Sequence, residues 1–114
     1  MIIDTSILDA YRDFMEEDAD EFIQEILGDF YKNSENLLEK LRFIPTEDQL
    51  DGFIRAAHTL KSTSATVGAT RLSEIAASIE EKGKELAFHE VAPLLPKLNE
   101  AFIEAEAKLK EIYS

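Results

Sequence analysis

The chain has 114 residues and no cysteine, and its 24 Asp and Glu residues against 12 Lys and Arg give a formal charge of -12. This charge argues against a nucleic-acid binder or a protein that lies on an anionic membrane, and the lack of cysteine excludes disulfides and thiolate metal sites. No apolar run approaches the roughly 20 residues that span a bilayer, and the start has no basic and apolar leader. We therefore expect one soluble, cytoplasmic and monomeric domain over residues 1–114, and the Met start fits a free-standing protein.

The first two predicted elements are amphipathic helices, because apolar residues recur at helical spacing from the start of the chain. The first helix is short, and either Asp4 or Thr5 is placed to act as its N-cap. The second helix is longer and begins after Asp18. Asn33 and Ser34 interrupt its apolar stripe, so the middle of this helix is the weakest part of the pattern.

The next two elements are also predicted to be helices. Pro45 ends the second helix, because the residue before a proline is pushed out of the α region. Thr46 and Gln49 have the spacing of a capping box and open a third helix. Gly68 is expected at the residue that terminates it. A fourth helix follows, with an apolar stripe that extends to Leu86.

The last predicted helix runs from about Glu90 to Tyr113. Pro93 fits its first turn, where no backbone donor is lost, whereas Pro96 lies deep enough that it could kink the helix. Short connections between long amphipathic helices favour antiparallel neighbours. We therefore predict an all-α fold, an up-and-down antiparallel four-helix bundle with an additional short N-terminal helix.

The acidic residues are unevenly distributed along the chain. They make up about a fifth of it, yet residues 52–73 contain none and carry +3, while the remainder carries -15. A tightly packed hairpin of small residues would explain this gap, and so would a functional surface. The same window places four hydroxyl residues in a helix interior, although all are weaker helix formers than Ala: Ser62, Thr63, Ser64 and Thr66.

His58 lies in this acid-free window, on the solvent flank of the third helix and away from its apolar stripe. Its neighbours on that side are Ile54, Lys61, Ser62 and Ala65. The small side chains leave room for another protein, and the lysine brings a cation that disfavours imidazolium and leaves a ring nitrogen free to attack. This arrangement suits reversible attack on a phosphoryl group. It does not suit a metal, because no second ligand lies one turn from the histidine.

Glu80 is predicted to lie opposite His58. Positions about ten to twelve residues on either side of the Gly68 turn come level in an antiparallel hairpin. Glu80 could then accept a hydrogen bond from Nδ1–H and leave Nε2 as the attacking nitrogen. Lys84, one turn further on, would balance Glu80 and could reach a phosphoryl oxygen. The alternative is that Glu80 and Lys84 form a surface pair of little energetic consequence.

The run from Ala56 to Glu80, AAHTLKSTSATVGATRLSEIAASIE, resembles the signature of histidine-containing phosphotransfer (HPt) domains. That signature has a histidine, any residue, an apolar residue, a lysine, small residues and a later glycine. The final helix, with LLPKLNEAF, is also similar to the family's last helix. Many members have glycine where Ser62 stands, which bears on partner preference more than on activity. The residues in register are His58, Leu60, Lys61, Ser62, Thr63, Gly68, Leu72 and Glu80.

The resemblance implies a four-helix bundle that carries phosphate on Nε2 of His58. The expected function is that of a phosphocarrier, which accepts the phosphoryl group from a receiver-domain aspartate or a sensor or hybrid histidine kinase and passes it to another receiver domain. By the same match Lys61 steadies the phosphoryl group, and Glu80 takes a place often held by Gln or Glu. The expected docking patch comprises Ile54, Arg55, Ser62 and Ala65.

Two further expectations concern what the chain lacks and what it could do instead. It has no Gly-rich nucleotide loop, so we expect no ATP binding and no autokinase activity, and we expect no cofactor or metal. His89, the other histidine, is expected to have a surface or capping role. The alternative function is that of a non-catalytic helical-bundle adaptor that uses the His58 face for binding only. An intact pair of His58 and Lys61 favours the phosphocarrier, since an adaptor has no chemical reason to keep it.

Overall fold

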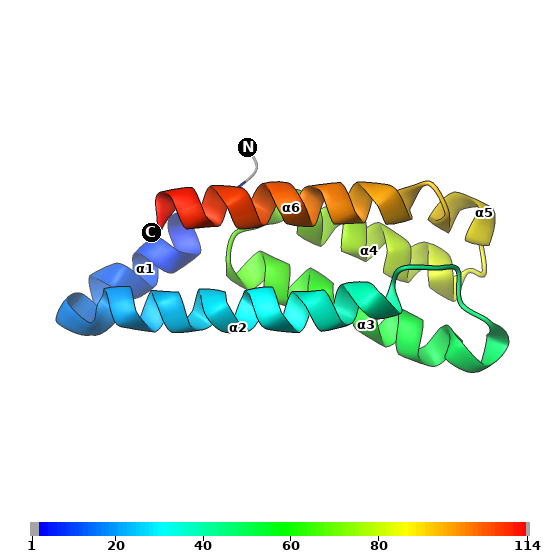
Figure 1. Ribbon diagram of the computed structural model, residues 1–114, viewed down its shortest axis with the longest axis horizontal. Helices are drawn as coiled ribbons and strands as arrows, with labels where there is room; N and C mark the ends of the chain where they lie inside the picture. The colour runs from blue at the N-terminus through cyan, green and yellow to red at the C-terminus, as the bar shows by residue number, and fades with distance from the viewer. Residues whose placement is uncertain (1–2, 114) are drawn as a thin grey trace.

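Helices account for nearly all of the computed structural model, which describes residues 3–113 except for the side chain of Glu16 (Figure 1). No strand occurs within this range. Two short 3-10 turns accompany the α-helices. The elements are α1 (Ser6–Met15), η1 (Glu16–Asp18), α2 (Ala19–Lys40), η2 (Glu47–Gln49), α3 (Leu50–Thr66), α4 (Thr70–Lys84), α5 (Phe88–Val91) and α6 (Leu94–Ile112).

The four long helices lie side by side along the long axis of the molecule (Figure 1). Successive long helices run in opposite directions, and α1 lies at the end of the bundle where α2 begins. The most extensive contact between any two elements is the one that joins α3 to α4. These observations confirm the predicted all-helical bundle with a short N-terminal helix.

A single apolar core runs through the bundle, because each long helix buries the stripe that its sequence repeats at helical spacing. Leu27 of α2, Leu60 of α3, Ile79 of α4 and Leu98 of α6 are all fully buried in it. Leu8 supplies the corresponding buried residue of α1. The core leaves the opposite sides of α3 and α4 available to solvent, and the candidate site lies there.

Several of the predicted helix signals are present in the structure. The carboxylate of Asp4 accepts a hydrogen bond from the Ser6 backbone N–H at 3.0 Å. The Gln49 side chain accepts one from the Thr46 backbone N–H at 3.1 Å, as the capping-box spacing predicts. Gly68 has φ +80°, a left-handed conformation that glycine adopts without strain. Asp18 does precede α2, but its side chain makes no capping hydrogen bond.

The polar pair in the second helix does not interrupt it, since α2 is continuous through Asn33 and Ser34. Asn33 is exposed, whereas Ser34 is fully buried. Among the described residues the Ser34 hydroxyl has no hydrogen-bond partner. Tertiary packing therefore overrides the weak helix preference of Ser34.

The predicted extent of the fourth helix is wrong at Leu86. Helix α4 ends at Lys84, and Leu86 has φ 59° and is 60% exposed. The Leu86 N–H donates to the Gly83 carbonyl and the Ala87 N–H to the Lys82 carbonyl. This is the Schellman pattern that closes a helix, with Leu86 in the position that glycine usually takes.

The predicted final helix is also corrected. It begins as the short α5, and α6 starts only at Leu94, directly after Pro93. Pro96 therefore lies within the first turn of α6, where its missing N–H would have no partner in the helix. For that reason Pro96 does not interrupt the helix, although its place in the sequence allowed a kink.

Candidate functional site

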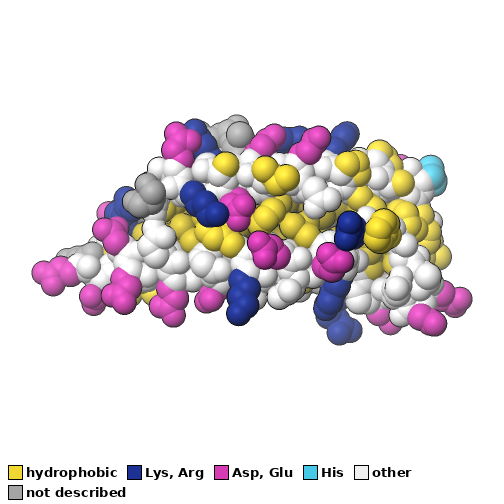
Figure 2. Space-filling view, in the orientation of Figure 1, with side chains coloured by type: hydrophobic (Ala, Val, Ile, Leu, Met, Phe, Trp, Pro, Cys, Tyr) yellow, Lys and Arg dark blue, Asp and Glu magenta, His cyan; other side chains and the backbone are white. Residues whose placement is uncertain are grey.

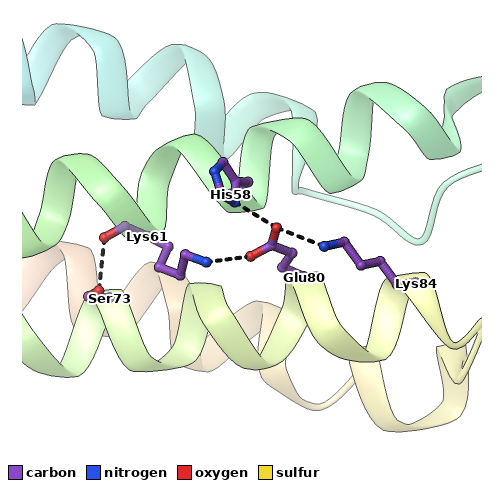
Figure 3. Close-up of polar contacts among 5 residues, drawn as sticks. All are labelled: His58, Lys61, Ser73, Glu80 and Lys84. Atoms are coloured by element: carbon purple, nitrogen blue, oxygen red, sulfur yellow. Dashed lines mark hydrogen bonds and ion pairs between the residues drawn. The ribbon is translucent and has the colours of Figure 1, made fainter.

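The hairpin of α3 and α4 brings together four of the predicted site residues, as Figure 3 shows. His58 and Lys61 come from α3, and Glu80 and Lys84 come from α4. The tight turn at Gly68 sets the register between the two helices. A hydrogen bond at 2.8 Å, from the Ser73 hydroxyl to the Lys61 carbonyl, ties them together beside the site.

Glu80 is the centre of this cluster. Its Oε2 lies 2.7 Å from His58 Nδ1 and 3.3 Å from Lys84 Nζ, and its Oε1 accepts from Lys61 Nζ at 2.8 Å. The Glu80 side chain is only 8% exposed, whereas that of His58 is 57% exposed. A buried carboxylate thus supports an imidazole that faces solvent.

The surroundings of Glu80 keep its carboxylate ionised. The hydrogen bond from Lys61 is the largest cause, and with those from His58 and Lys84 it lowers the Glu80 pKa to about 2, although burial acts in the opposite direction. An ionised carboxylate can only accept, so Nδ1 of His58 must carry the proton in this contact. In a neutral ring the lone pair is then on Nε2, which has no hydrogen-bond partner among residues 3–113.

One of the two lysines differs from the prediction, because Lys61 pairs with Glu80 just as Lys84 does. Lys61 is therefore not a free cation beside the imidazole. Lys61, Lys84 and Glu80 together carry a net charge of +1. A hollow of about 380 Å³ adjoins them, and it is lined by Lys61, Ala77, Glu80, Glu81, Lys84 and Glu85.

The predicted docking residues lie along α3 on either side of His58. Arg55, Ser62 and Ala65 are exposed. Ile54 is half-buried and lies next to Gly83 of α4, where an added Cβ would be 3.5 Å from its Cγ1. The structure thus leaves small or flexible side chains around the imidazole, whereas His89 is exposed on α5 and contributes nothing to the Glu80 cluster.

The hydroxyl residues of the acid-free window have different environments. Thr63 and Thr66 donate to backbone carbonyls of their own helix, those of Leu60 and Ser62. Ser64 is fully buried, and its hydroxyl lacks a hydrogen-bond partner among the described residues. The helix itself therefore satisfies two of these hydroxyls, and packing within the bundle accounts for a third. Ser73, which does contact the site, was missed because its only signal was its place at the end of the window.

Comparison with known proteins supports one family. A family model described as the Hpt domain matches residues 6–108. No curated protein and no solved structure gave a significant match. No helix within residues 3–113 has the length and apolar character needed to cross a membrane. Hpt domains act in phosphotransfer in two-component signalling, where they interact with receiver domains and histidine kinases. Because the match spans nearly the whole chain, this protein belongs to the Hpt domain family.

Proposed function

We propose that the protein is a phosphorelay carrier and that His58 is its phosphoacceptor. It takes the phosphoryl group from a receiver-domain aspartate or a histidine kinase and passes it to another receiver domain. The observation that carries this proposal is the 2.7 Å contact between Nδ1 of the exposed His58 and the buried carboxylate of Glu80. This contact selects the tautomer with a lone pair on the solvent-facing nitrogen.

The transfer step follows from that tautomer. Nε2 of His58 attacks the phosphorus of an aspartyl phosphate, and a nitrogen–phosphorus bond forms as the bond from phosphorus to the aspartate oxygen breaks. The aspartate leaves as a carboxylate. The ring retains its proton on Nδ1 and gains positive charge, which faces the ionised Glu80. The reverse step occurs when the aspartate of the next receiver attacks the phosphohistidine.

Lys61 and Lys84 supply the charge that the incoming group requires. The phosphoryl group brings about two negative charges, and Glu80 adds one. Two ammonium groups and the phosphorylated imidazolium balance them. Lys84 has a flexible and largely exposed side chain, so it can turn from Glu80 towards a phosphoryl oxygen.

The docking patch of this proposal comprises Ile54, Arg55, Ser62 and Ala65. Ile54 provides apolar contact, and the two small residues allow a receiver domain to approach the imidazole closely. Arg55 lies at the rim, in a segment without acidic residues that would repel the receiver's acidic phosphorylation site.

The decisive experiment mixes the protein with receiver domains already loaded with aspartyl phosphate. We expect acid-labile, base-stable phosphate on the 114-residue chain and none on the His58→Gln variant, whose helical circular dichroism should be unchanged. The matched control is His89→Gln, which removes the other histidine and should accept phosphate normally. Phosphate on the His58→Gln variant would refute the site. Binding without transfer across the whole receiver panel would favour the adaptor function instead.

A further inference from the structure

A second surface, unrelated to His58, is formed by an exposed apolar stripe on α1. Ile7, Tyr11 and Phe14 recur at helical spacing beside the buried Leu8, and all three are exposed, with Phe14 at 87%. The Tyr11 ring packs edge-on against Phe22 of α2, with 5.5 Å between ring centroids. A hollow of about 400 Å³ lies along the stripe and is lined by Ser6, Ile7, Ala10, Tyr11 and Phe14.

This stripe lies at the most acidic end of the molecule. The first 25 residues hold nine Asp and Glu residues against one arginine, so -8 of the total charge of -12 belongs to them. The one arginine is already engaged, because Arg12 pairs with Asp20 at 3.5 Å and lies over the Tyr113 ring. Acidic side chains are prominent at this end in Figure 2.

Acidic residues also flank the stripe on both sides. On α1, Asp13 is exposed and lies on the side of Phe14 away from the core. Asp18, at the end of η1, and Glu25 of α2 lie one turn before and one turn after Phe22, and both are exposed. The surface is therefore an apolar strip between two negatively charged borders.

We propose that this surface docks a basic amphipathic helix of a partner protein. The apolar side of such a helix would cover Tyr11 and Phe14, and its Lys and Arg residues would reach the acidic borders. A second copy of the chain is the wrong occupant, because it would bring two ends of charge -8 together. An anionic lipid surface is repelled for the same reason.

The proposed surface is separate from the phosphotransfer site. The Asp4 N–H donates to the Gly68 carbonyl, so the segment before α1 lies against the turn between α3 and α4. His58 precedes the last residue of α3, Thr66, by eight residues, which is about 12 Å along a helix. A helix on α1 could therefore hold a partner while the His58 face remains open.

The test measures binding of a synthetic peptide of about 18 residues, long enough to be helical, with Leu on one side and Lys on the other. We expect amide shift changes in NMR spectra to map to α1 and the first turns of α2. Phe14→Ser should weaken binding about tenfold. The matched control is Phe43→Ser, which removes another exposed aromatic ring, in the loop after α2, and should leave binding unchanged. A rise in NaCl from about 50 to 300 mM should weaken binding by a similar factor.

Other outcomes would overturn the proposal. The proposal is wrong if the peptide does not bind, if a peptide with Glu in place of Lys binds equally well, or if the shift changes are centred on α3. Self-association of the wild type that Phe14→Ser abolishes would assign the surface to a second copy, and binding to phosphatidylserine vesicles would assign it to lipid. The His58→Gln variant should bind the peptide as tightly as the wild type, so this test is independent of the phosphotransfer proposal.

Discussion

At the scale of single residues, Glu80 links the stability of the site to its proposed chemistry. Its buried carboxylate contacts one imidazole and two ammonium groups. A buried charge is tolerated only when it is paired and hydrogen-bonded, and the loss of a partner leaves it uncompensated. The same contacts orient His58, so a change at Glu80 should affect both folding and transfer.

The first prediction concerns acid stability. Because the Glu80 pKa is lowered from its ordinary value of 4.5 to about 2, its contribution to the free energy of unfolding is complete above pH 4.5 and is lost as pH falls towards 2. Urea unfolding of the wild type and Glu80→Gln over this range should show the difference between them shrinking as pH falls. A difference that stays constant across the range would mean that the carboxylate is not held ionised.

The second prediction concerns the two lysines. Lys61→Ala and Lys84→Ala should each slow phosphate transfer to His58 by about tenfold or more, because each removes a cation that would meet a phosphoryl oxygen. The matched control is Lys82→Ala in the same helix, since Lys82 pairs instead with Glu90 at 3.3 Å. Rapid-quench kinetics measures the three rates. If Lys82→Ala slowed transfer as much as the other two, the rate would depend on the overall charge of the protein and not on the cations beside His58.

At the scale of elements, the ends of α3 and α4 use the same closure with different residues. Both have the paired hydrogen bonds of a Schellman motif and a left-handed residue, which is Gly68 after α3 and Leu86 after α4. Glycine adopts that conformation freely, whereas leucine does so under strain. Gly68 also touches the backbone before α1, where an added Cβ would lie 1.8 Å from the Asp4 carbonyl oxygen.

The third prediction is that substitutions at these two ends have opposite signs. Gly68→Ala should destabilise the protein by roughly 3 kcal/mol, because it adds a left-handed alanine and a backbone clash. Leu86→Gly should stabilise it by roughly 1 kcal/mol, because the leucine is exposed and strained. Gly28→Ala, in the interior of α2 with open space at its Cβ, is the control and should stabilise by up to about 1 kcal/mol. Denaturant unfolding measures all three, and destabilisation by Leu86→Gly would contradict the assignment of strain.

The elements that could be predicted are those set by local sequence. Apolar spacing identified the long helices, and the pair of Thr46 and Gln49 identified the entry to α3. The glycine at 68 fixed the turn, and counting from it placed Glu80 level with His58, which is the register of the structure. Each of these depends on helix geometry alone.

Most of the features that could not be predicted depend on tertiary contacts. The end of α4 is an exception: the apolar pattern continued to Leu86, and the local closure there has a leucine where glycine is the usual signal. Ser34 was expected to weaken α2, yet packing buries it. The pairing of Lys61 with Glu80, and the bond from Ser73 to the Lys61 carbonyl, join different helices, so nothing in the spacing along one helix indicates them.

At the scale of the whole molecule, charge is divided between two regions. The acid-free segment 52–73 contains His58 and carries +3, although Lys61 pairs with Glu80 and Arg71 with Glu104, and the first 25 residues carry -8 at the end of the bundle. The first region suits an acidic receiver site, and the second suits a basic helix. One small bundle therefore presents a site where cations and carboxylates are paired and, at its end, a strongly acidic surface, so two different partners could be bound at the same time.

In the proposed mechanism, Glu80 holds His58 with its proton on Nδ1 and its lone pair on Nε2. The most direct measurement is a long-range proton–nitrogen NMR spectrum of the His58 ring, recorded before and after phosphate transfer from a loaded receiver. We expect a protonated Nδ1 and an unprotonated Nε2 in the free protein, and phosphorus coupling to Nε2 after transfer. A proton on Nε2 in the free neutral ring, or phosphate on Nδ1, would contradict it.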